Sequence, residues 1–140
     1  MGLTVSGSEQ ESWYTTHPEH KIHVEIGNDQ ITTVFKGKTI AESDKVLVLR
    51  ESQHGPVYYF PRESVLMGYL ERTDHHTYCP FKGEASYWTI RVNGRSLENA
   101  VWSYEDPFVE VASIKDYVAF YINKMDSWYA NGEPLDPATA

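Results

Sequence analysis

The only cysteine of the chain, Cys79, stands close to two histidines and a lysine. It follows His75 and His76 and precedes Lys82, and a histidine or a nearby cation can activate a thiolate as a nucleophile. On a strand the two adjacent histidines would point to opposite faces, so at most one of them could reach the thiol. We therefore take Cys79 and His75 as candidate catalytic residues. In the alternative interpretation Cys79 is a small buried apolar residue, as most free cysteines are.

Two cations of the chain could bind a carboxylate or a phosphate group. Arg62 follows a proline that ends a strand, and Lys82 lies in a loop beside Gly83. Both cations could orient an anionic group of a ligand. In the alternative interpretation Arg62 pairs with Glu63 or Glu84 and only fixes the loop. The sequence leaves both interpretations open.

Aromatic residues with a polar tip are abundant, with ten tyrosines and four tryptophans in 140 residues. Such side chains suit the wall of a ligand cavity, because an apolar ring carries a hydrogen-bonding group. By strand alternation about half of them should instead belong to the core on the other face. The predicted ligand-binding residues are Tyr59, Arg62, Cys79, Lys82, Glu84, Tyr87, Trp88, Trp102 and Tyr104.

Three histidines near the N-terminus recur at every third position: His17, His20 and His23. Imidazole is a common ligand of zinc, copper and nickel. However, Pro18 argues against one regular element in this segment, and residues 22–26 already alternate as a strand. We expect no native metal site here and no cofactor.

Alternating apolar residues predict a series of β-strands, arranged from residue 22 as a β-meander. The apolar run at residues 46–49 predicts a strand that is buried on both faces. Asn93-Gly94 predicts a hairpin, because both residues tolerate the positive φ of a type I′ turn. Segment 71–84 has no clean period and is predicted to be a long loop that carries the site. The expected strands cover residues 22–26, 31–35, 39–42, 45–50, 57–60, 87–92, 100–104, 117–123 and 127–129, and the expected short helices cover residues 62–69 and 109–116.

Length and composition indicate one folded domain. The chain is 41% hydrophobic and carries a formal net charge of −8, from 20 acidic and 12 basic residues. An acidic protein repels phosphate backbones, so nucleic acid is not an expected partner. No apolar run is long enough to span a membrane, and the N-terminus lacks the pattern of a secretory signal. We expect a cytoplasmic protein with a flexible N-terminal arm (residues 1–16), one domain (17–133) and a frayed tail (134–140).

Five short motifs follow one another along the chain. They are Tyr58-Tyr59-Phe60-Pro61-Arg62-Glu63, Cys79-Pro80-Phe81-Lys82-Gly83, Tyr87-Trp88, Val101-Trp102-Ser103-Tyr104 and Tyr117-Val118-Ala119-Phe120-Tyr121. Over residues 17–133 the set resembles the domain of unknown function 427 family, which is also labelled a nucleotidyltransferase domain. The resemblance implies a compact all-β domain related to the β-tent architecture, in which two antiparallel sheets enclose a ligand-sized pocket. Many tent-like domains hold a structural zinc on two Cys-x-x-Cys hairpins, and a chain with Cys79 alone cannot form that site.

The transferase label finds little support in the residues themselves. Nucleotidyl transfer needs carboxylates that hold magnesium and a loop that cradles phosphates. Asp74, Glu84 and Asp106 are available but are expected on separate loops, and the chain has no Walker-type glycine loop.

The sequence therefore predicts a mainly β, antiparallel single domain of β-tent or barrel-like form with one or two short helices. The leading function is to bind a small molecule in an aromatic-lined pocket, with Arg62 and Lys82 as cationic anchors and no membrane partner. The alternative is an enzyme: a Cys79-dependent or metal-dependent transferase, such as a nucleotidyltransferase. The third is a protein-interaction module, and a homodimer is left open. A deep pocket would favour the first two functions, and a flat exposed aromatic patch the third.

Overall fold

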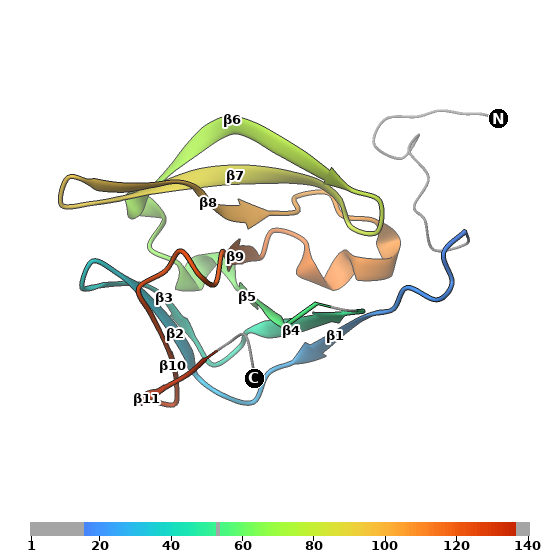
Figure 1. Ribbon diagram of the computed structural model, residues 1–140, viewed down its shortest axis with the longest axis horizontal. Coiled ribbons are helices and arrows are strands. Elements are labelled where there is room, and N and C mark those ends of the chain that lie inside the picture. Colours follow the sequence, from blue (N-terminus) through green and yellow to red (C-terminus); the bar gives the residue numbers. More distant parts are fainter. Residues whose placement is uncertain (1–15, 53, 137–140) are drawn as a thin grey trace.

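Two antiparallel β-sheets make up the structure, a computed structural model that describes residues 16–52 and 54–136 (Figure 1). The larger sheet has the strand order β1 (Ile22–Ile26), β4 (Leu47–Glu51), β5 (Val57–Phe60), β9 (Val118–Phe120), β8 (Arg95–Ser103), β7 (Gly83–Val92) and β6 (Leu70–Cys79). The smaller sheet has the order β11 (Glu133–Pro134), β10 (Ser127–Ala130), β2 (Ile31–Phe35) and β3 (Lys38–Ser43). Neither sheet closes on itself, so the mainly β, antiparallel prediction is confirmed in a form that is not a closed barrel.

The larger sheet is strongly curved. In Figure 1 it runs from β1 at the lower right through β4, β5 and β9 to β8, β7 and β6 at the top. The smaller sheet lies at the lower left of the same view and packs against one face of the larger sheet. The curvature brings β6 and β7 over β4, although these strands lie at different ends of the sheet order.

The main core fills the space between the two sheets. Alternate residues of the central strands point into it, among them Tyr58 and Phe60 of β5 and Phe120 of β9. Ile40 of β3 meets them from the smaller sheet and is fully buried. The Phe60 and Phe120 rings meet edge to face, with 5.7 Å between their centroids.

A second apolar cluster lies on the opposite face of the larger sheet. Tyr59 of β5 and Ala119 of β9 belong to it, because they alternate with the residues of the main core. Val111 and Ile114 of the 3₁₀ helix η3 (Val109–Ile114) are buried in this second cluster. Residues 46–49 alternate between the two clusters, which confirms the predicted strand buried on both faces.

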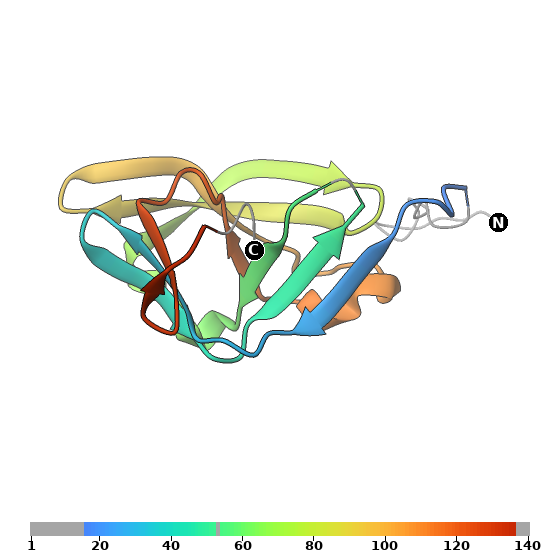
Figure 2. The ribbon, with the colours of Figure 1, turned by 60° about the horizontal axis from the view of Figure 1, so that its bottom comes forward.

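The predicted β-meander is wrong at its first step and again between β3 and β4, which lie in different sheets. β1 pairs with β4, with Ile22 opposite Glu51, whereas β2 belongs to the other sheet. The chain does not turn back after β1, because the Gly27 N–H donates to the Val46 carbonyl at 2.9 Å and continues the contact with β4. Figure 2 shows the chain passing from β1 along the base of the molecule to β2. Local alternation identified both strands but could not identify their partners.

The predicted site loop at 71–84 is also wrong, because most of it is strand β6. β6 pairs with β7 from Leu70 opposite Ile90 to Cys79 opposite Gly83. The register shifts between Arg72 and His76, and such an irregularity breaks the period of two that would have revealed the strand. As an edge strand, β6 also exposes most of its side chains, so few apolar residues mark its buried face.

The predicted helix at 62–69 is two separate 3₁₀ helices, η1 (Arg62–Ser64) and η2 (Met67–Tyr69). Val65 between them is extended and forms an isolated bridge with Ala41 of β3, which interrupts the helical path. η3 ends two residues before the predicted end of its helix. In the described part of the chain no helix is long and apolar enough to cross a membrane.

Several boundaries differ from the prediction while the elements themselves exist. β9 covers only the middle of the strand predicted at 117–123, and β8 begins at Arg95 rather than at residue 100. Asn93 and Gly94 have φ values of 51° and 79°, as a type I′ turn requires. The predicted arm at 1–16 lies outside the described residues except for Thr16, and the predicted tail begins within β11 and extends beyond the described residues.

Candidate functional site

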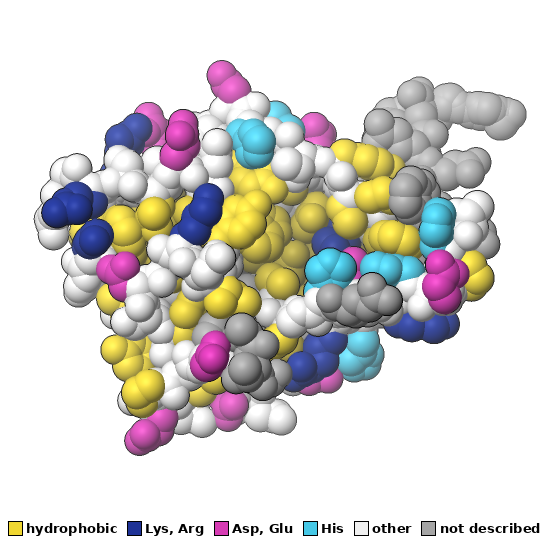
Figure 3. All heavy atoms as spheres, viewed as in Figure 1, with side chains coloured by type: hydrophobic (Ala, Val, Ile, Leu, Met, Phe, Trp, Pro, Cys, Tyr) yellow, Lys and Arg dark blue, Asp and Glu magenta, His cyan; other side chains and the backbone are white. Residues whose placement is uncertain are grey.

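Aromatic side chains gather on the face of the larger sheet that is turned away from the smaller sheet. Figure 3 shows hydrophobic side chains in a hollow between β6–β8 and β4, with histidine side chains along its rim. We call this site the aromatic hollow and define it by residues of the second apolar cluster. They are Tyr59, Tyr87, Trp102, Tyr104 and Tyr121.

Trp102 connects the floor of the aromatic hollow to its rim. Its indole N–H donates a hydrogen bond to the Tyr59 hydroxyl, at 3.3 Å, and the two rings meet edge to face. On its other side the indole lies against the Tyr121 ring, with 4.7 Å between centroids. Tyr59 is 1% exposed, whereas Trp102 and Tyr121 are half-buried, so the hollow opens towards solvent through these two rings.

Strand β6 borders the aromatic hollow because two of its residues contact Tyr87 of the neighbouring strand β7. The Tyr87 hydroxyl lies 2.8 Å from the Thr77 hydroxyl, and the His75 ring packs against the Tyr87 ring at 4.6 Å. Burial and the hydrogen bond with Tyr87 raise the pKa of Tyr121 to about 12. The Tyr121 phenol is therefore neutral at physiological pH and serves as a hydrogen-bonding group rather than as a charge.

Two buried phenols at the floor have hydroxyl protons without an acceptor in the part of the chain that the structure describes. Tyr104 is only 6% exposed, and its hydroxyl makes no hydrogen bond to any of the described residues. The Tyr59 oxygen accepts from Trp102, but its own proton has no acceptor among the same residues. Burial raises the pKa of both phenols, and the nearby Cys79 adds to the increase. An unpaired buried hydroxyl costs about 1–3 kcal/mol, so such groups call for a physical explanation.

A buried ion pair lies beside these phenols. Lys82 Nζ donates to one Glu51 oxygen and His20 Nε2 donates to the other, both at 2.7 Å. Burial by itself would raise the pKa of the Glu51 carboxyl, but the hydrogen bonds and charges of Lys82 and His20 outweigh burial and lower it. The His20 ring also stacks on Phe81, with 4.0 Å between centroids. The pair thus holds the segment before β1 against the loop between β6 and β7.

Cys79 lies at the end of β6 and packs against the aromatic hollow as a half-buried side chain. Its thiol is close enough to Tyr59 and Tyr104 to affect their titration. Of the two histidines near it in sequence, His75 contacts Tyr87, whereas His76 pairs with the exposed Glu84 at 3.7 Å. The two histidines thus have different partners, and no hydrogen bond joins Cys79 to either one among the described residues.

Arg62 and Trp88 lie on the other face of the sheet. The Arg62 guanidinium donates to the Ser103 hydroxyl at 3.0 Å, to Glu105 at 3.2 Å and to the Asp116 carbonyl at 3.1 Å. It also lies 5.2 Å from the centre of the Trp88 ring, which belongs to the main core. The partner of Arg62 is therefore Glu105 rather than Glu63 or Glu84.

The nine predicted ligand-binding residues thus fall into two groups. The structure brings six of them together in or beside the aromatic hollow: Tyr59, Cys79, Lys82, Tyr87, Trp102 and Tyr104. It places Arg62, Trp88 and Glu84 elsewhere. Sequence reasoning missed Glu51 and Tyr121, although Tyr121 ends one of the five motifs, and it considered His20 only as a metal ligand.

Acidic, histidine and cysteine side chains are the groups that could bind a metal ion. Within residues 16–52 and 54–136 no three of them gather in a way that could hold a metal ion. His20 and His23 bond to different glutamates, Glu51 and Glu25 respectively, so they do not converge.

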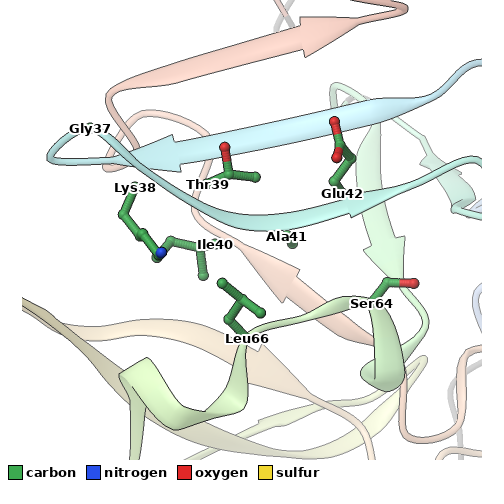
Figure 4. Close-up of a pocket in the computed structure, with 8 residues that line it drawn as sticks. All are labelled: Gly37, Lys38, Thr39, Ile40, Ala41, Glu42, Ser64 and Leu66. Atoms are coloured by element: carbon green, nitrogen blue, oxygen red, sulfur yellow. The ribbon is translucent and has the colours of Figure 1, made fainter.

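A separate cavity of about 460 Å³ lies on the smaller sheet, beside its edge strand β3 (Figure 4). Ile40 and Leu66 point toward one another across it. Its two charged side chains are engaged already, since Glu42 accepts from Thr32 at 2.9 Å and Lys38 lies over the Tyr69 ring. None of the predicted site residues lines this cavity. We therefore place the candidate site in the aromatic hollow.

Comparison with protein families gives one match. A family model described as a domain of unknown function, DUF427, matches residues 23–131. The matched segment runs from β1 to the end of β10 and includes every residue of the aromatic hollow. None of the curated proteins matches the chain.

Proposed function

The chain belongs to the DUF427 family, whose description assigns no activity, and we propose from the geometry of the aromatic hollow that it binds a small molecule there. The observation that carries the proposal is the buried Tyr104 hydroxyl at the floor of a ring-lined hollow. It has no partner among the described residues, and a bound ligand would supply one. Concave sites with mostly apolar walls and a few convergent polar groups are typical of small-molecule binding.

Each part of the hollow has a role in this proposal. The rings of Tyr87, Trp102 and Tyr121 form the walls, and the hydroxyls of Tyr59 and Tyr104 orient the ligand from the floor. Lys82 lies beside these groups, but its ammonium group pairs with Glu51 and does not serve as an anchor for an anion. Arg62 takes no part, because its guanidinium is engaged on the other face of the sheet.

Catalysis is the less favoured proposal because the residues that could act as a base or a nucleophile, Glu51 and Cys79, are not arranged for it. Both oxygens of Glu51 accept charged hydrogen bonds, which leaves this carboxylate poorly placed to act as a base or to hold magnesium. A thiolate at Cys79 would need a base within reach, and the histidines nearest to it in sequence have other partners.

The indole N–H signals of ¹⁵N-labelled protein would test the proposal. Trp102 reports on the hollow, since its N–H bonds to Tyr59, while Trp128 is a matched internal control whose N–H bonds to the Ile122 carbonyl. A set of small aromatic compounds should contain members that shift the Trp102 signal in a saturable way and leave the Trp128 signal in place. If no compound moves Trp102, or if both signals move together, the proposed site is wrong.

A further inference from the structure

The hydrogen-bonding groups of the aromatic hollow are unbalanced towards donors. The Tyr59 and Tyr104 protons have no acceptor in the described part of the chain. The strongest acceptor nearby is the Glu51 carboxylate, and Lys82 and His20 already occupy one oxygen each at 2.7 Å. A ligand that complements this floor has to bring an acceptor of its own.

The charges at the same place select among possible acceptors. The Lys82 ammonium would favour an anion, but it is 9% exposed and directly paired with Glu51, so its charge is balanced within the protein. A carboxylate ligand would also have to be desolvated close to the Glu51 carboxylate, and like charges repel strongly in a partly buried site. A cationic ligand would find no free carboxylate oxygen on Glu51, because Lys82 and His20 already occupy both.

From this balance, and resting on the proposed function, we infer that the hollow takes a neutral aromatic ligand whose carbonyl or amide oxygen accepts a hydrogen bond from Tyr104. The ring of such a ligand suits the walls, where Trp102 and Tyr121 already pack ring against ring. The oxygen satisfies the hydroxyl that the protein leaves unpaired. In this inference Tyr104 selects ligands that carry a hydrogen-bond acceptor, and the Glu51–Lys82 pair excludes anionic ligands.

Four aromatic probes of similar size test separately for a neutral acceptor, an anion, a cation and an apolar ring. Benzamide is neutral and carries a carbonyl acceptor, benzoate replaces it by an anion, benzylamine carries a cation, and toluene has no polar group. Titrations that follow the Trp102 indole signal should give benzamide the highest affinity. Tyr104→Phe, which removes only the hydroxyl, should weaken benzamide roughly three- to tenfold, as expected for one hydrogen bond, and leave toluene unchanged.

Tyr58→Phe is the control for this variant. Tyr58 is also 6% exposed, but it points into the main core, and its ring lies against Trp128. The control should bind all four probes as the unmodified protein does. A cooperative thermal melt of Tyr104→Phe, at a temperature no lower than that of the unmodified protein, would show that the variant is folded.

The possible results separate this inference from the proposed function. If benzoate binds at least as tightly as benzamide, or if Tyr104→Phe binds benzamide normally, the assignment of a neutral acceptor is overturned while ligand binding in the hollow stands. If none of the four probes moves the Trp102 signal, both the inference and the proposed function fall.

Discussion

At the residue scale, neighbouring tyrosines of β5 have opposite roles because their side chains alternate. Tyr58 packs into the main core, and Tyr59 lies at the floor of the aromatic hollow. The same rule separates Trp88 from Tyr87 on β7. Tyrosine identity alone therefore does not mark a site, and the decisive information is the face on which each ring lies.

Arg62 should stabilise the fold without contributing to ligand binding. Replacing it by alanine removes three hydrogen bonds, one of them to the fully buried Ser103, and urea unfolding should show a loss of about 1.5–3 kcal/mol. The Trp102 response to benzamide should be retained.

Arg72→Ala is the control, because Arg72 also pairs with Glu105 and lies over Trp88 but has a more exposed side chain. Arg72→Ala should lower the free energy of unfolding by less than Arg62→Ala does. Normal stability of Arg62→Ala together with lost probe binding would instead make Arg62 a ligand anchor.

Glu51 should make the stability of the fold sensitive to acid. Its folded-state pKa lies below the ordinary value of 4.5, so the ionised carboxylate stabilises the folded state. This stabilisation is complete at pH values above the ordinary pKa of 4.5. It is lost as the pH falls through the lowered pKa that Glu51 has in the folded state. Glu51→Gln should therefore flatten the decline of the unfolding free energy between about pH 5 and pH 3, measured by urea titration.

Glu63→Gln is the control for this titration, because Glu63 is exposed. Its profile should follow that of the unmodified protein. Some acid sensitivity should persist in both variants, since Arg72 and Arg62 outweigh burial and lower the pKa of Glu105 as well. A Glu51→Gln profile parallel to the unmodified one would contradict the role given to this carboxylate.

At the element scale, the sequence predicted local structure better than pairing. Strands β1, β2 and β5 were found with their bounds, because alternation is a property of neighbouring residues. The pairing of β1 with β4 and the strand character of β6 were missed, because both depend on partners elsewhere in the chain. An edge strand with an irregular register gives little local signal.

The residues of the candidate site were likewise predictable where the signal is local and not where it depends on distant partners. The four predicted aromatic residues of the hollow were recognisable by their polar-tipped rings within strand motifs. Glu51 was not, since a glutamate at the end of a strand usually faces solvent and only the fold brings Lys82 and His20 to it. For Arg62, the sequence could not distinguish a ligand anchor from a brace, because Glu105 lies 43 positions away.

The turn between β7 and β8 should depend on the positive φ of Gly94. No atom lies within 4 Å of the place where its Cβ would stand, so Gly94→Ala tests backbone strain alone. We expect a loss of roughly 1 kcal/mol in the free energy of unfolding.

Gly68 offers the matched control, with equally open space and no positive φ. Gly68→Ala should change stability by less than about 0.5 kcal/mol. Equal effects of the two substitutions would mean that the turn does not require the left-handed conformation.

At the scale of the whole molecule, the larger sheet is used on both faces. One face packs on the smaller sheet and forms the main core, while the curvature of the other face creates the aromatic hollow. His20 and Phe81 stack beside the hollow, so a segment that precedes the first strand helps to frame the site. This division separates residues needed for folding from residues available to a ligand.

A crystal structure of the protein soaked with benzamide tests this account most directly. We predict electron density for the probe in the aromatic hollow, with its carbonyl oxygen about 2.5–3.0 Å from the Tyr104 hydroxyl and its ring against Trp102. The opposite face of the larger sheet, where Arg62 lies, should remain unchanged. A hollow that contains only ordered water bonded to Tyr104 and Tyr59 at saturating benzamide, or a probe bound only elsewhere, would contradict the account.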